Sequence, residues 1–152
     1  MKLKIEIGRQ GNFIFALLLI YFVFFGYICN VYEKNVGDGV LFLYKIIFSP
    51  VSILSGIILF VIVFIMVLRE NFFEYGIRNS IWLIPFIIVM SWIWYWFLYG
   101  FDFGMVVFYF IRFESYLTIL TLLGINLLAA LSASIAKERY ARFITEVKEI
   151  ET

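Results

Sequence analysis

The side chains that could carry chemistry in this sequence are few and far apart. The 152 residues include one cysteine, Cys29, and no histidine. An internal disulfide, a zinc site built from thiolate pairs and histidine-based catalysis are therefore excluded. Arg112 and Glu114 are the best remaining charged pair, but a spacing of two directs them to different faces of a helix. We expect an interfacial pair there, and a protein with no enzymatic activity, cofactor or metal.

Four long apolar runs must position all other residues. The chain is 64% hydrophobic and 15% charged, with a mean hydropathy of +1.02, whereas soluble domains are about half apolar and a quarter charged. A bilayer core requires about 20 apolar residues per helix, and uncharged runs occupy residues 12–32, 46–68, 80–101 and 115–136. The sequence predicts an all-α polytopic membrane protein with four transmembrane helices in residues 1–137 and an amphipathic helical tail in residues 138–152.

The basic residues predict the orientation of these helices. Nine of the twelve Lys and Arg residues flank the apolar runs on one side of the predicted membrane, and Lys34, Lys45 and Arg112 flank them on the other. Both termini are therefore expected in the cytoplasm of a bacterium, with the chain in its inner membrane. No run contains Asp, Glu, Lys or Arg, which argues against an ion-coupled pump. Asp38 and Asp102 are predicted to lie in outward connections, whereas an intramembrane aspartyl protease requires its paired Asp residues within transmembrane helices. The sequence therefore argues against such a protease. The nine are Lys2, Lys4, Arg9, Arg69, Arg78, Lys137, Arg139, Arg142 and Lys148.

The connections between the runs are unusual. The outward connections at residues 40–48 and 102–114 are apolar but too short to span a bilayer. We expect them to lie in the outer interface or to extend the neighbouring helices, with Pro50 in the first turn of the second helix. The inward link at residues 69–79 is expected to be a short turn anchored at the interface.

The last apolar run differs from the others in having no aromatic residue. Of the 33 Phe, Tyr and Trp residues, 31 precede Leu117, and residues 117–137 contain none. Small residues allow transmembrane helices to approach closely, so this helix is expected at the centre, either packed within one chain or forming a seam between copies. The predicted packing residues are Ser52, Gly56, Gly124, Asn126, Ala129, Ala130, Ser132, Ala133, Ser134 and Ala136.

Asn126 lies deep within that run. A buried amide in hydrocarbon usually bonds a neighbouring helix, which is the interpretation we favour. The alternative is that Asn126, Ser132 and Ser134 line a pore.

The end of the chain carries an amphipathic pattern. Apolar side chains recur near the i, i+3, i+4, i+7 spacing of a helix, and Glu138, Arg142 and Glu146 are spaced by four. The fourth helix is therefore expected to continue about four turns, roughly 20 Å, into the cytoplasm. A sister copy, the membrane surface or a soluble protein must cover the stripe, and its mixed charge favours a protein. The predicted partner-binding residues are Tyr140, Arg142, Phe143, Ile144, Val147 and Ile150.

The chain resembles the small membrane subunit of the Kiwa anti-phage system in its size, its four apolar runs and its predicted cytoplasmic termini. It also shares an amino-acid composition typical of AT-rich genes, which is rich in Ile, Phe, Tyr and Asn and poor in Pro and Ala. The resemblance implies a homo-oligomer, with a tetramer favoured, that detects phage attack at the inner membrane and engages a cytoplasmic DNA-binding protein. The chain itself, with a net charge of +1, is not expected to bind nucleic acid directly. A pore-forming or holin-like effector and an accessory subunit of a larger membrane complex are the alternatives.

Overall fold

The computed structural model describes residues 2–26, 42–48 and 52–150; of these, the side chains of residues 2–9, 42, 52, 149 and 150 are not described. The described part is 93% helical and has no strand, which confirms the prediction of an all-α chain. The helices in order are α1 (Lys2–Leu19), the π-helix η1 (Ile20–Phe25), α3 (Phe42–Phe48), α4 (Ser52–Arg69), α5 (Phe73–Tyr99), α6 (Gly104–Ile111) and α7 (Phe113–Ile150).

Two of these helices, α5 and α7, are long and apolar enough to cross a membrane. The apolar parts of α1–η1 and of α4, Gln10–Phe25 and Ile53–Arg69, are shorter. Only 28% of the most apolar 18-residue window of α5, and 28% of that of α7, is buried. Most of their apolar surface therefore faces outward, unlike the surface of a core helix in a soluble protein.

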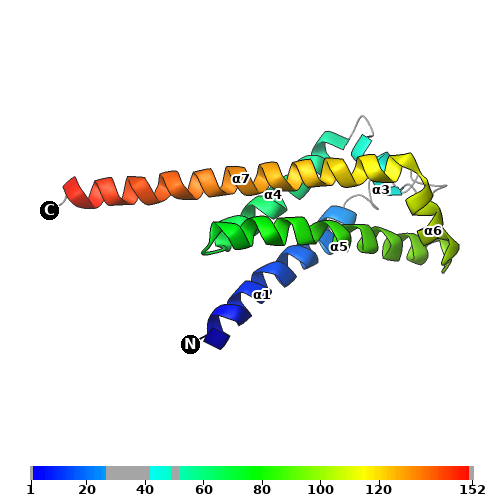
Figure 1. Ribbon diagram of the computed structural model, residues 1–152, viewed down its shortest axis with the longest axis horizontal. Helices are drawn as coiled ribbons and strands as arrows, with labels where there is room; N and C mark the ends of the chain where they lie inside the picture. Colours follow the sequence, from blue (N-terminus) through cyan, green and yellow to red (C-terminus); the bar gives the residue numbers. More distant parts are fainter. Residues whose placement is uncertain (1, 27–41, 49–51, 151–152) are drawn as a thin grey trace.

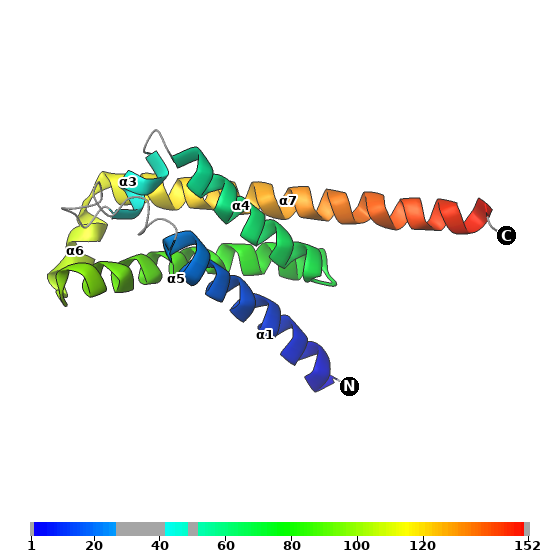
Figure 2. The same ribbon diagram turned by 180° about the vertical axis from the view of Figure 1, so that it is seen from behind.

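The helices form a bundle with α7 along one side (Figure 1). α4 and α5 form a hairpin, and α7 packs along both of them and also contacts α3 and α6. α1 and η1 pack against α4 and α5. Figure 2 shows, from behind, that α6 crosses between the ends of α5 and α7, whereas the far end of α7 projects beyond the other helices. The start of α1 and the end of α7 lie at the same end of the bundle.

Several predicted helix boundaries are wrong. The first helix begins at Lys2 rather than at residue 12. Residues 46–48 belong to α3 rather than to the second long helix, α4, as the prediction of a separate segment over residues 40–48 allowed. The 69–79 link is not a turn over its whole length, because α5 already begins at Phe73. Apolar runs mark where lipid can solvate a helix, but charged residues such as Glu74 and Arg78 are equally compatible with helix beyond that region.

The two connections that were predicted to face outward are largely helical: α3 (Phe42–Phe48) lies within the first and α6 (Gly104–Ile111) within the second. Residues 27–32 of the first run, with Cys29, lie outside the described residues, as do Asp38 and Pro50. The prediction of a continuous last helix is confirmed: α7 has 38 residues and includes the predicted tail to Ile150.

Candidate functional site

The buried face of α7 consists mainly of polar and small residues. Ser115, Thr118, Leu122 and Asn126 are at most 1% exposed, as are Ala129, Ala130 and Ala133. They recur every three or four positions, so they form one stripe along the helix, and α4 and α5 are the main helices packed on α7. Four of the predicted packing residues (Asn126, Ala129, Ala130 and Ala133) thus lie in an interface within the single chain.

Asn126 joins the two longest helices. Its Nδ2 donates a 2.8 Å hydrogen bond to the main-chain carbonyl oxygen of Ser80 in α5, so the predicted bond to a neighbouring helix is confirmed. Its Oδ1 is buried without a hydrogen-bond partner among the described residues. The hydroxyl of Ser80 instead donates to the carbonyl of Ile77 in its own helix, at 2.7 Å.

The other predicted packing residues lie outside that interface or at its edge. Gly124 and Ala136 are exposed, and Gly56, Ser132 and Ser134 are half-buried. A Cβ atom added at Gly56 or Gly124 would meet nothing within 4 Å, so neither glycine marks a close helix approach within the chain. The Ser134 hydroxyl bonds the carbonyl of Leu131 in its own helix, at 2.8 Å. Ser52 begins α4, but its side chain is not described.

Polar side chains gather where α4 ends. The last carbonyls of a helix lack partners within it and accept bonds from side chains. Here the Asn12 Nδ2 of α1 donates to the Arg69 carbonyl at 3.4 Å, and the Lys137 Nζ of α7 donates to the Glu70 carbonyl. A cation near a helix C-terminus is also favoured by the helix dipole. These bonds tie α1 and α7 to the same turn.

The Glu70 side chain is part of this arrangement. It is only 5% exposed, and its Oε1 accepts a 3.3 Å hydrogen bond from the Asn79 Nδ2 of α5. Sequence analysis did not single out Asn12, Glu70 or Asn79. The available signal was that polar residues stand where apolar runs begin and end, at positions where helix ends need donors and acceptors.

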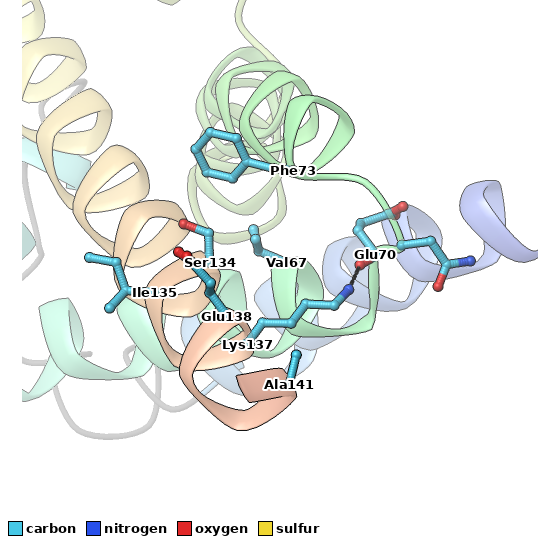
Figure 3. A pocket seen from close by; sticks show the side chains of 9 residues that line it. Val67, Glu70, Phe73, Ser134, Ile135, Lys137, Glu138 and Ala141 are labelled. Atoms are coloured by element: carbon cyan, nitrogen blue, oxygen red, sulfur yellow. Dashed lines mark hydrogen bonds between the residues drawn. The ribbon is translucent and has the colours of Figure 1, made fainter. Parts of the chain in front are cut away.

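A pocket of about 460 Å³ lies between this turn and α7, where the projecting end of α7 begins (Figure 3). Val67, Phe73 and Ile135 supply apolar walls, and Lys137 and Glu138 supply opposite charges. In Figure 3 the Lys137 side chain extends across the pocket toward Glu70. The pocket is therefore mixed in character, and it adjoins the predicted tail. The remaining lining residues are Glu70, Asn71, Ser134 and Ala141.

The projecting end of α7 is uncovered in the single chain. Tyr140 and Phe143 are 67% and 63% exposed, and Ile144 and Val147 are partly exposed. Arg142 forms an ion pair with Glu138, as predicted from the spacing of four. The end of α7 thus presents two aromatic rings beside both signs of charge; the side chain of Ile150 is not described.

The opposite end of the bundle is rich in aromatic contacts. Tyr109 of α6 is 1% exposed and packs edge-on against Trp92 of α5, and burial raises the pKa of Tyr109 to about 12. The Trp96 Nε1 of α5 donates to the Asp102 carbonyl at 3.0 Å. Arg112 lies over the ring of Phe108, 4.7 Å from its centroid, and among the described residues it forms no ion pair with Glu114.

Searches against protein-family models, curated proteins and solved structures find no match to this chain. The resemblance to the Kiwa membrane subunit therefore stays a prediction, and the comparisons assign the chain to no family.

Proposed function

We propose that this protein is a non-enzymatic scaffold of the bacterial inner membrane that uses the projecting end of α7 to bind a cytoplasmic protein. One observation carries the proposal. α7 is a single helix of 38 residues, about 57 Å long, whereas a bilayer core is about 30 Å thick. Part of α7 must therefore extend beyond the membrane if the rest crosses it, and that part exposes Tyr140 and Phe143.

Four crossings agree with the outward-facing apolar side chains of every long helix. Ile14 and Phe22 of the first helix, and Ile53 and Ile57 of α4, are between 51% and 74% exposed. Such surfaces are costly in water and suited to lipid. The common end of α1 and α7 also carries most of the basic residues, so the proposed orientation places both termini in the cytoplasm.

The resemblance to the Kiwa membrane subunit supplies a biological setting for this proposal. In that setting the chain forms a homo-oligomer, detects phage attack at the membrane and recruits a DNA-binding protein. The aromatic end around α6 is then the sensing region, and the end of α7 with its adjoining pocket is the docking region. Transmission between them runs along one helix, because α7 contacts α6 at one end and lines the pocket further along.

Removal of residues 138–152 tests the docking role. Tagged full-length and truncated chains are co-expressed with the products of their neighbouring genes and purified from membranes. The truncated chain is expected to insert normally and to lose the co-purified partner. Undiminished recovery of the partner by the truncated chain would contradict the proposal.

A point variant makes the same test without shortening the helix. Phe143→Ala combined with Tyr140→Ala removes both exposed rings, and we expect at least about a tenfold loss of partner recovery, since buried aromatic anchors commonly contribute 2 kcal/mol or more. Thr145→Ala is the matched control, because Thr145 is exposed on the same segment and its hydroxyl bonds only the Ala141 carbonyl, at 3.0 Å. Recovery should be unchanged for Thr145→Ala.

A further inference from the structure

A groove of about 450 Å³ lies between α1 and α5, apart from the pocket beside α7. Its polar lining consists of Gln10, Arg78 and Asn79. Its apolar lining consists of Phe13, Ile14, Trp82 and Phe86. The groove therefore combines a polar part with a larger apolar part, as an amphipathic ligand requires.

The two parts are separated along the groove. α1 and α5 both begin at the end of the bundle from which α7 projects (Figure 1). Gln10, Arg78 and Asn79 precede the apolar lining residues in each helix, so the polar part lies toward that end. Further along, the rings of Phe13 and Phe86 meet edge-on, with centroids 5.6 Å apart. The groove is thus polar where the proposed orientation places the cytoplasmic headgroups and apolar where it places the acyl chains.

The polar part is suited to an anion. Arg78 is exposed and lies over the ring of Tyr75, 4.8 Å from its centroid, without a carboxylate partner among the described residues. None of the described residues that line the groove is Asp or Glu. The carboxylate bonded to a lining residue is that of Glu70, which is 5% exposed and accepts from Asn79. A guanidinium flanked by side-chain amides binds phosphate oxygens well.

We propose that this groove binds an anionic phospholipid of the cytoplasmic leaflet, with the phosphate at Arg78 and an acyl chain along Phe13, Trp82 and Phe86. The inference rests on the membrane orientation given under Proposed function. Basic pockets between transmembrane helices on the cytoplasmic side are typical sites for such headgroups. A free phosphate would occupy only the polar part of the groove and leave the apolar lining, including Trp82, which is 59% exposed, without a contact to the ligand. A lipid covers both parts of the groove.

Lipid retention by the full-length chain tests this assignment. The protein is purified in detergent and titrated with phosphatidylglycerol or phosphatidylcholine bearing the same acyl chains, and bound lipid is counted by native mass spectrometry. Phosphatidylglycerol is expected to bind at least about fivefold more tightly, because its net charge is negative whereas the choline of phosphatidylcholine neutralises the phosphate; one basic residue near an anionic lipid surface contributes about that factor. Arg78→Gln should abolish the preference, and Trp82→Ala should weaken the binding of both lipids.

Arg112→Gln is the matched control. Arg112 is also exposed and also lies over an aromatic ring, but at the opposite end of the bundle, so its replacement should leave the preference intact. Equal binding of the two lipids, or a preference that survives Arg78→Gln, would overturn the proposal. So would displacement of the lipid by millimolar inorganic phosphate, which would identify a site for a free anion.

The lipid site and the protein-docking role fail in different ways. A chain without residues 138–152 should keep the phosphatidylglycerol preference, and Arg78→Gln should keep the co-purified partner. Loss of the lipid preference alone removes only the lipid site, whereas loss of tail-dependent partner recovery alone removes only the docking role.

Discussion

At the scale of single residues, Asn126 is the polar side chain with the most consequence for packing. It is 0% exposed, and it bonds a main-chain carbonyl of α5 rather than a side chain. Its Oδ1 has no partner among the described residues, so within them only the Nδ2 of the amide forms a hydrogen bond. The bond holds α7 in register against α5, because sliding either helix by one residue would separate Asn126 from Ser80.

Asn126→Ala should lower the free energy of unfolding by about 0.6–2 kcal/mol, the usual contribution of an interhelical hydrogen bond in a membrane protein. Unfolding in mixed micelles titrated with dodecyl sulfate measures the change. Ser134→Ala is the control, since the Ser134 hydroxyl bonds only its own helix, and it should change stability by less than about 0.5 kcal/mol. An Asn126→Ala variant as stable as the control would show that the bond adds nothing.

The sequence predicted that Asn126 would bond a neighbouring helix, but not which one. Lipid offers an amide no hydrogen-bond partner, so burial alone implies a bond within the protein. The acceptor, however, is a main-chain carbonyl, and every residue of every helix has one. Which carbonyl accepts the bond depends on the register of α7 against α5. Packing sets this register, and the sequence around Ser80 does not indicate it.

At the scale of helices, the α4–α5 hairpin depends on a close approach at Gly76. A Cβ atom added there would lie 2.8 Å from the Val67 Cγ1. Val67 is 4% exposed, and a β-branched side chain in a helix has essentially one χ1 rotamer. The side chain therefore has little freedom to move aside, and the hairpin requires glycine at this position.

Gly76→Ala should consequently destabilise the protein by about 1–3 kcal/mol through overpacking. If the two helices were not in close contact here, the same change would instead stabilise the helix by about 0.5–1 kcal/mol. The sign of the change in unfolding free energy therefore distinguishes a close approach from a loose one. In a Val67→Ala background the clash is absent, and adding Gly76→Ala should be neutral or favourable. A double-mutant cycle by the same dodecyl sulfate titration measures this coupling.

The helices themselves were only partly predictable. Residues 117–137 were correctly expected to form a helix that packs on other helices through small residues, because helices that pack closely in lipid favour small side chains. The expected central position is not seen in the single chain, where α7 lies along one side of the bundle (Figure 1). The hairpin glycine was not identified, since Gly76 lies in a charged segment, residues 69–79, that hydropathy alone marks as a link. Glycine within a helix signals close packing only when its neighbour in space is known.

At the scale of the whole molecule, the proposed orientation places Phe101 outside the cell and Val147 in the cytoplasm. Single cysteines introduced by Phe101→Cys or Val147→Cys, each in a Cys29→Ser background, test this arrangement. A membrane-impermeant maleimide should label the first variant in intact spheroplasts and the second only after lysis, because both side chains are exposed. Labelling of both variants before lysis, or of neither, would contradict four crossings with a common side for the termini.

Function was less predictable than architecture. Composition and hydropathy lead to an all-helical chain rich in outward-facing apolar surface, because those quantities sum over many residues. The groove at Arg78 and the pocket at Lys137 depend on two or three side chains brought together from separate helices. Residues such as Gln10 and Trp82 gain their significance only from that juxtaposition.

The unbroken length of α7 has a mechanical consequence. α7 has no proline and no break between Phe113 and Ile150, so it moves as one stiff helix. The bond from the Lys137 Nζ to the Glu70 carbonyl holds α7 at the edge of the bundle. When a bilayer thins or thickens, a transmembrane helix responds by changing its tilt. Under the proposed orientation, such a change of tilt in the membrane-spanning part of α7 also displaces its projecting end, so a protein bound at Phe143 would move when the thickness of the membrane changes.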